Sequence, residues 1–241
     1  MPEILVAALI GVVSMLYATA GQAGGTAFVA VMGLAAFPAA QLRPTALALN
    51  VVAAGYATWR LRASDAFDIR TFGLLAIPSV AAAFVGGLLV LDERAYSGLT
   101  GSLLLVAGVL LVVRRSAVQP PRKLPAIFAA LAGATTGLLS GLTGVGGGVF
   151  LAPLLIALGW MSARGAAVIS PPFILCNSAV GLAGVILSGQ AASSLTPLYA
   201  AAALAGATIG SAIARRSMSE RATRLVLAAL LTFAGLRLAL G

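Results

Sequence analysis

The chain has 241 residues, of which 61% are hydrophobic and only 9% are charged, and its mean hydropathy is +1.07. Soluble domains carry about 25% charged residues, so this composition excludes an ordinary water-soluble fold and predicts an all-α polytopic membrane protein. Without histidine and with the single cysteine Cys176, the chain cannot form a histidine metal site, a cysteine metal cage or an intramolecular disulfide. We therefore expect no cofactor and no bound metal.

Taken in chain order, the apolar runs predict ten helical segments. They are 4–20, 24–38, 45–59, 71–91, 95–113, 124–140, 146–159, 165–188, 196–214 and 222–240. The runs 4–20, 24–38 and 146–159 are short, because 15 residues span roughly 22 Å and the hydrocarbon core is roughly 30 Å thick. The first two segments, and likewise the sixth and seventh, form either two full crossings or a re-entrant hairpin. Both arrangements return the chain to the same side of the membrane.

The basic residues predict an orientation. Twelve of the 15 lie in one set of alternate loops: Arg60, Arg62, Arg70, Arg114, Arg115, Arg122, Lys123, Arg164, Arg215, Arg216, Arg221 and Arg224. The other three, Arg43, Arg94 and Arg237, lie in the opposite set. By the positive-inside rule the first set is cytoplasmic, which places both termini outside. This topology also accounts for the net charge of +9, so we expect no nucleic-acid partner.

The two halves of the chain resemble each other. "GQAGGTAFVAV" at 21–31 is similar to "GVGGGVFLAPL" at 144–154. The paired residues are Gly24 with Gly146, Gly25 with Gly147, Phe28 with Phe150, Arg43 with Arg164, and Asn50 with Asn177. Each half has an odd number of crossings, so tandem halves must lie in opposite orientations, as in many secondary transporters. We predict a first repeat over 1–116, a cytoplasmic linker over 117–123 and a second repeat over 124–241.

The Gly-rich stretches predict breaks in two helices near the membrane midplane. A break in lipid is tolerated only against protein or a wet cavity, because its N–H and C=O groups need partners. The freed amides of Gly24, Gly25 and Thr26, and of Gly146, Gly147 and Gly148, would lie at helix starts, which bind anions without a formal cation. The alternative is that these glycines only permit close helix packing, which is how we interpret Gly86–Gly87 and 206–210.

Uncharged donors around the breaks fit an oxyanion. The candidates are Gln22, Thr26, Asn50, Ser140, Thr143, Ser170, Asn177 and Ser178. Arg43 and Arg164 are predicted in equivalent loops on opposite faces, where each would draw anions into a cleft, the alternative being ordinary loop arginines. All six acids lie in loops or at segment ends, which argues against a buried proton relay.

The second half carries a family resemblance. "GLTGVGGGVFLAPLL", "ILCNSAVGLAGVILSGQ" and "GATIGSAIARR" resemble the TauE/SafE family of sulfite and organosulfonate exporters, strongly from Ala134 to Arg216 and weakly in the first half. The resemblance implies a multi-pass transporter of small sulfur oxyanions or organosulfonates in the cytoplasmic membrane. The first loop departs from the family pattern, with fewer glycines and no following proline, so neither the particular anion nor the coupling follows from the resemblance.

The sequence therefore predicts a secondary transporter that exports a sulfite- or sulfonate-class anion by alternating access, and the membrane potential alone could drive that export. An enzyme is not expected, because the glycines form neither a P-loop nor a dinucleotide fingerprint. Two alternatives remain open: a passive anion channel, and a membrane assembly subunit with no transport role.

Overall fold

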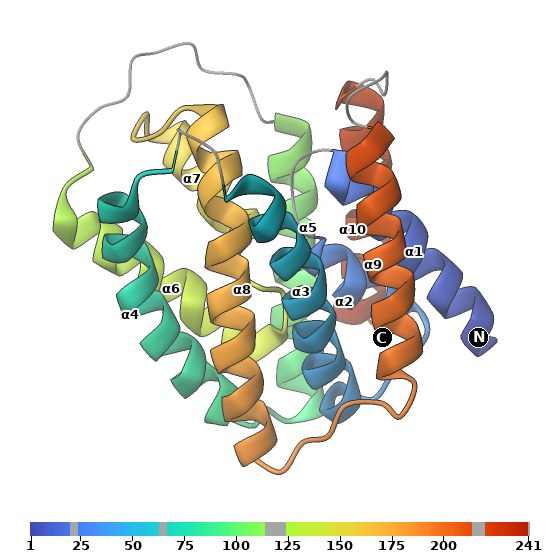
Figure 1. The fold of residues 1–241 in the computed structure, drawn as a ribbon. Helices are drawn as coiled ribbons and strands as arrows, with labels where there is room; N and C mark the ends of the chain where they lie inside the picture. The colour runs from blue at the N-terminus through green and yellow to red at the C-terminus, as the bar shows by residue number, and fades with distance from the viewer. Residues whose placement is uncertain (20–23, 63–66, 114–123, 214–219, 241) are drawn as a thin grey trace.

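The computed structural model describes residues 1–19, 24–62, 67–113, 124–213 and 220–240, and these residues form ten α-helices and no strand (Figure 1). The helices are α1 (Glu3–Thr19), α2 (Gly25–Leu34), α3 (Ala39–Leu61), α4 (Ile69–Leu88), α5 (Glu93–Val113), α6 (Ala126–Thr143), α7 (Gly148–Ala157), α8 (Ala163–Leu187), α9 (Thr196–Ile213) and α10 (Glu220–Leu240). Each predicted apolar segment corresponds to one helix, so the all-α class is confirmed.

The largest difference from the predicted boundaries is at the start of α3. The helix begins at Ala39 rather than near residue 45, and it includes Arg43 and Pro44. The charge and the proline together suggested a loop. In the structure, Pro44 lies in the second turn of the helix, and Arg43 is buried with its charge satisfied by protein carbonyls.

Within the described ranges, four helices are long and apolar enough to cross a bilayer. These spans are Ile69–Leu88, Ala126–Thr143, Arg164–Leu187 and Thr196–Ile213. By contrast, α2 and α7 have ten residues each, and ten residues rise only about 15 Å. The first residue of each short helix lies beside the middle of the long helix that follows it in the chain. Gly25 lies against Asn50, the twelfth residue of α3, and Gly148 lies against Ile174, the twelfth residue of α8.

Glycines bring the long helices into backbone contact. Gly133, Gly137 and Gly141 of α6 face Leu75, Ser79 and Ala83 of α4, so these two helices run in the same direction. Likewise, Gly206 and Gly210 of α9 face Gly11 and Met15 of α1. Gly86 faces the carbonyl of Leu138 and Gly87 faces that of Gly181, which confirms that Gly86–Gly87 and the glycines of 206–210 serve close packing.

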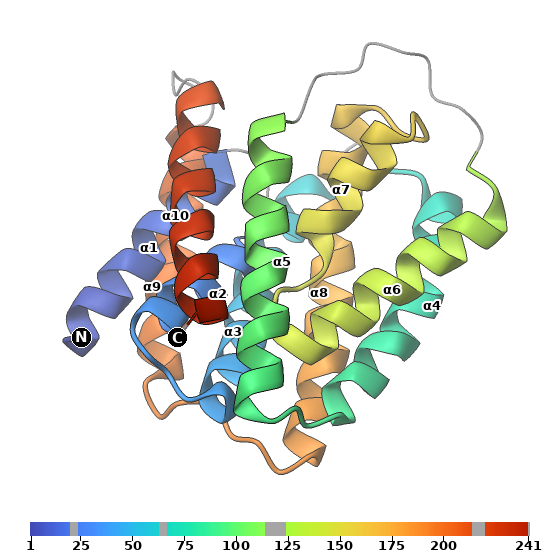
Figure 2. The same cartoon turned by 180° about the vertical axis from the view of Figure 1, so that it is seen from behind.

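Two other helix pairs run in opposite directions. In α5 and α10, Gly101 lies near Gly235 and Ala239, whereas Gly108 lies near Ala228 and Thr232. In α3 and α8, Gly55 faces Leu175, and the side chain of Leu47 lies near Gly181. Both ends of the chain lie toward the same end of the helix bundle (Figures 1 and 2).

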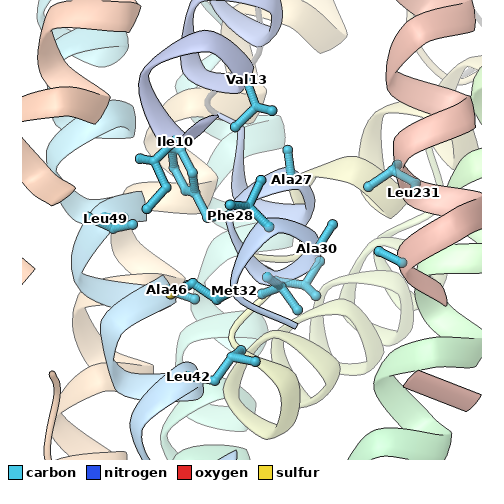
Figure 3. Close-up of a cluster of buried hydrophobic side chains, with 14 of the residues drawn as sticks. Ile10, Val13, Ala27, Phe28, Ala30, Met32, Leu42, Ala46, Leu49 and Leu231 are labelled. Carbon is cyan, nitrogen blue, oxygen red and sulfur yellow. The ribbon is translucent and has the colours of Figure 1, made fainter. Parts of the chain in front are cut away.

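The short helix α2 lies in the protein interior. Every residue from Gly25 to Gly33 is buried. Phe28 and Met32 pack with apolar side chains of three neighbouring helices (Figure 3). These neighbours include Ile10 and Val13 of α1, Leu42, Ala46 and Leu49 of α3, and Leu231 of α10. The start of α2 is therefore kept from lipid, which satisfies the condition for a break inside a membrane.

The substitution Gly137→Ala should weaken the packing of α4 on α6. The added Cβ would lie 2.0 Å from the Ser79 carbonyl oxygen, and a backbone oxygen within a helix cannot move aside. We expect a loss of stability of about 1–3 kcal/mol, measured by thermal unfolding in detergent. Gly98→Ala is the control, since nothing lies within 4 Å of its added Cβ. Equal melting temperatures for the two variants would contradict the packing role.

Candidate anion site at the helix breaks

A helix break is present at each of the two predicted places, one in each half of the chain. α6 ends at Thr143 and α7 begins at Gly148, and the intervening Gly144, Gly146 and Gly147 have φ of 82°, 84° and 72°. Gly24, which precedes α2, has φ of 82°. These left-handed conformations are disfavoured for side chains with a Cβ, so glycine is required for the chain to turn here. Gln22 lies outside the described residues.

The two breaks meet in the middle of the protein. A Cβ added to Gly25 would lie 2.2 Å from the carbonyl oxygen of Val145, so the start of α2 touches the loop before α7. Asn50 lies beside both breaks. Its Oδ1 is 3.0 Å from the Cβ position added to Gly25, and its Nδ2 is 2.9 Å from the Cβ position added to Gly146. Its Nδ2 donates to the Gly144 carbonyl at 3.0 Å. That bond sets the orientation of the amide, because a carbonyl can only accept.

Of the buried polar atoms that have no hydrogen-bond partner among the described residues, three belong to residues beside this meeting point, and a fourth belongs to Asn177, which precedes Ser178 on α8. The four atoms are Asn50 Oδ1, Ser140 Oγ, Asn177 Nδ2 and Ser178 Oγ. Ser178 Oγ lies 3.4 Å from the added Cβ position of Gly146, and Ser140 Cβ lies 3.5 Å from that of Gly147. Asn177 is held by Ser79, whose hydroxyl donates to Asn177 Oδ1 at 2.9 Å. A buried polar group without a partner costs about 1–3 kcal/mol, so such a cluster is a candidate place for a ligand, an ion or an ordered water to supply the partners.

Three of these atoms can donate to an anion. Ser140 and Ser178 each have a hydroxyl hydrogen, and the Asn177 amide has two N–H groups. The start of α7 adds the positive end of a helix dipole, although the N–H groups of Gly148, Phe150 and Leu151 already donate to the carbonyl oxygens of Gly146 and Gly147. This combination resembles other anion sites at helix starts. Among the described residues, no cluster of histidine, cysteine, aspartate or glutamate could hold a metal ion.

Three predicted donors are bonded elsewhere. The Thr143 hydroxyl donates to the Leu139 carbonyl at 2.6 Å, and the Ser170 hydroxyl donates to the Ala166 carbonyl at 2.7 Å. The hydroxyl of Thr26 is hydrogen-bonded to that of Tyr17 at 2.5 Å. Each of these side chains already has a partner on its own or an adjacent helix, so we leave all three out of the proposed set of ligands.

The prediction that Arg43 and Arg164 lie in loops is wrong, and the two side chains have different surroundings. Arg43 lies inside α3 and is 1% exposed, whereas Arg164 is an exposed residue in the first turn of α8. Neither lies in a loop. Arg43 donates to the carbonyl oxygens of Gly141, Gly86, Gly87 and Leu89 at 2.5–2.8 Å. Its guanidinium is therefore engaged by the protein itself.

Two contributors were missed by the sequence analysis. Ser79 orients Asn177, and Tyr96 donates its hydroxyl to the Thr143 carbonyl at 2.9 Å. Their partners lie 98 and 47 residues away in the chain. A serine or tyrosine in an apolar helix can also bond its own backbone or lie at the membrane surface, so no local signal distinguishes these two.

Comparison with known proteins decides the family. Residues 4–238 match the family model described as "Sulfite exporter TauE/SafE". The chain belongs to the TauE/SafE family. It is also 34% identical over 242 residues to the "Probable membrane transporter protein y4hK" of Sinorhizobium fredii (strain NBRC 101917 / NGR234), with 94% of each chain covered. As a TauE/SafE member the protein is a multi-pass membrane transporter with a small-molecule substrate, and it is not an enzyme.

Proposed function

We propose that this transporter exports a small sulfur-containing anion, sulfite or an organosulfonate, across the cytoplasmic membrane. The observation that carries the proposal is a set of buried donors without partners among the described residues: Ser140 and Ser178 beside the loop before α7, and Asn177, which precedes Ser178 in the chain. An oxyanion with three sulfur-bound oxygens could accept from the Ser140 and Ser178 hydroxyls and from the Asn177 amide. The start of a helix carries about half a positive charge, which favours an anion.

The uncharged site suits transport, because an anion bound without a formal cation can leave again. Export would be driven by the membrane potential. A cell that is negative inside gives an outgoing anion about 2.3 kcal/mol per charge per 100 mV. No proton relay is needed for this mechanism.

The proposed mechanism is alternating access between two inverted repeats, 1–116 and 124–241, joined by a cytoplasmic linker over 117–123. The helix pairing supports the repeats, with α1 to α5 corresponding to α6 to α10. α6 packs in parallel on α4 and α1 packs in parallel on α9, so each pair is the counterpart of the other. Two helices contact their own counterparts in the other repeat, α3 with α8 and α5 with α10. Both of these pairs are antiparallel, as expected for a two-fold axis in the membrane plane.

Gly25 contacts Val145 at the meeting point of the two breaks. We propose that the substrate enters when these two loops separate toward the cytoplasm, and that it leaves when they separate toward the outside. Both termini would lie outside, because the loops rich in arginine would be cytoplasmic.

The test is transport by the purified protein. A thermal-shift screen against sulfite, sulfate, thiosulfate, taurine and sulfoacetate would identify the anion, and proteoliposomes with a potassium–valinomycin potential would measure its efflux. We expect potential-dependent efflux that Gly147→Leu and Asn177→Leu reduce at least about tenfold, since each removes or blocks a donor to a charged ligand. Unchanged flux in both variants would contradict the site. Flux above carrier rates without trans-stimulation would indicate a channel, and no response to any anion would favour an assembly subunit.

A further inference from the structure

The end of α6 exposes backbone carbonyls inside the protein, and each needs a donor because no water is available in lipid. Three of them are satisfied by side chains. The Gly141 carbonyl accepts from Arg43 Nε at 2.7 Å, the Thr143 carbonyl from the Tyr96 hydroxyl at 2.9 Å, and the Gly144 carbonyl from Asn50 Nδ2 at 3.0 Å. All three donors come from the first half of the chain, on α3 and α5.

Arg43 also binds the end of α4. Its remaining bonds go to the carbonyl oxygens of Gly86, Gly87 and Leu89, at 2.5, 2.7 and 2.8 Å. The guanidinium thus bridges the carboxyl ends of two helices, each of which carries about half a negative charge. Together they compensate about one unit of charge, which explains how an arginine is buried with carbonyl oxygens as its bonding partners.

The loop that follows α6 cannot hold its own position well. It contains Gly144, Gly146 and Gly147, all with positive φ, and glycine loses more conformational freedom on folding than any other residue. Its shape must therefore come from contacts with neighbouring elements. Its first residue, Gly144, is bonded to Asn50, and the last turn of α6 before it is bonded to Arg43 and Tyr96.

We infer that Arg43 and Tyr96, together with Asn50, hold the break between α6 and α7 in place, and that Arg43 and Tyr96 are positioning residues for the proposed anion site rather than ligands or gates. The inference rests on the proposed function as far as anion binding is concerned. The role of Arg43, Tyr96 and Asn50 in holding the loop between α6 and α7 does not depend on which substrate is bound.

The test uses Tyr96→Phe, Arg43→Lys and Arg43→Gln in the full-length protein. Two readouts are needed: the Kd for whichever of the five screened anions stabilises the wild type, and hydrogen–deuterium exchange of the amides at 141–150. We expect Tyr96→Phe to raise Kd about 5- to 10-fold and Arg43→Gln at least about tenfold, since each leaves a break carbonyl without its donor. Arg43→Lys should be intermediate, because an ammonium has three donors but no planar fork. Exchange at 141–150 should quicken in all three.

A merely structural loss would reduce the number of binding sites per protein and leave Kd unchanged, so the two parameters are measured separately. Controls are Tyr199→Phe, a buried tyrosine of α9, and Arg94→Gln, an exposed arginine of α5. Both should keep the wild-type Kd and exchange. If Arg43→Gln does not fold, the Kd and exchange of Tyr96→Phe and Arg43→Lys decide whether Arg43 and Tyr96 position the site.

Wild-type Kd in folded Tyr96→Phe and Arg43→Lys would overturn the positioning of the site, and unchanged exchange at 141–150 would overturn the role at the break. If the wild-type protein binds none of the five anions, the proposed substrate class fails. The exchange measurement then still decides whether these residues hold the loop.

Discussion

Gly25→Ala should abolish transport. The added Cβ would lie 2.2 Å from the Val145 carbonyl oxygen and 3.0 Å from Asn50 Oδ1, so it would push apart the two breaks where they meet. Because the nearest atom is backbone, no side-chain rotation can relieve the contact. We expect the efflux rate in proteoliposomes to fall at least about a hundredfold, as displacement of a site by about 1 Å can cost that much.

The matched control for this prediction is Gly73→Ala in α4. Nothing lies within 4 Å of the Cβ it adds, and alanine is favoured over glycine in a helix, so stability should rise by about 0.5–1 kcal/mol with normal efflux. Retention of near wild-type efflux by Gly25→Ala would show that the two breaks do not need to touch during transport.

Ser178→Ala should make the protein more stable and its anion binding weaker. The buried Ser178 hydroxyl has no partner among the described residues, so its removal relieves a cost of about 1 kcal/mol, or about 2–4 °C in melting temperature. The same removal takes one donor from the anion. Hydrogen bonds to charged groups contribute about 1.5–3 kcal/mol, so Kd should rise at least about tenfold. Thermal unfolding and isothermal titration measure the two effects.

Thr58→Val separates these two effects. The Thr58 hydroxyl is also buried without a partner among the described residues, but Thr58 lies near the end of α3, eight residues beyond Asn50. We expect a similar gain in stability with no change in Kd. If Ser178→Ala lowered the melting temperature and left Kd at the wild-type value, Ser178 would be a packing residue and the site would have to lie elsewhere.

These opposite effects describe a general cost of function. The buried donors of Ser140, Asn177 and Ser178 have no partner within the part of the chain that the structure describes, and a protein selected only for stability would replace them with apolar side chains. In the proposed mechanism those donors exchange their ligand on every cycle. The lost stability would then be part of that mechanism, since a site with fully satisfied donors would have nothing to offer an anion.

Much of the helical framework could be predicted from the sequence, because the signals that define it are local. Apolar runs predicted all ten helices, and the glycines at 24–25 and 144–148 predicted the breaks between α1 and α2 and between α6 and α7. Backbone conformation and hydropathy depend on a residue and its near neighbours, so they can be interpreted without knowing the fold.

The polar interactions of the site were decided only by the tertiary structure. Arg43 and Arg164 have matching places in the sequence, yet one is buried against the ends of α4 and α6 and the other is exposed. Asn50 and Asn177 also match, yet Asn50 caps the end of α6 and Asn177 is held by Ser79. The partners of Arg43 lie 43 to 98 residues away in the chain. Whether a polar side chain is free to bind a ligand depends on which distant backbone groups folding brings within about 3 Å of it, and no local pattern specifies that.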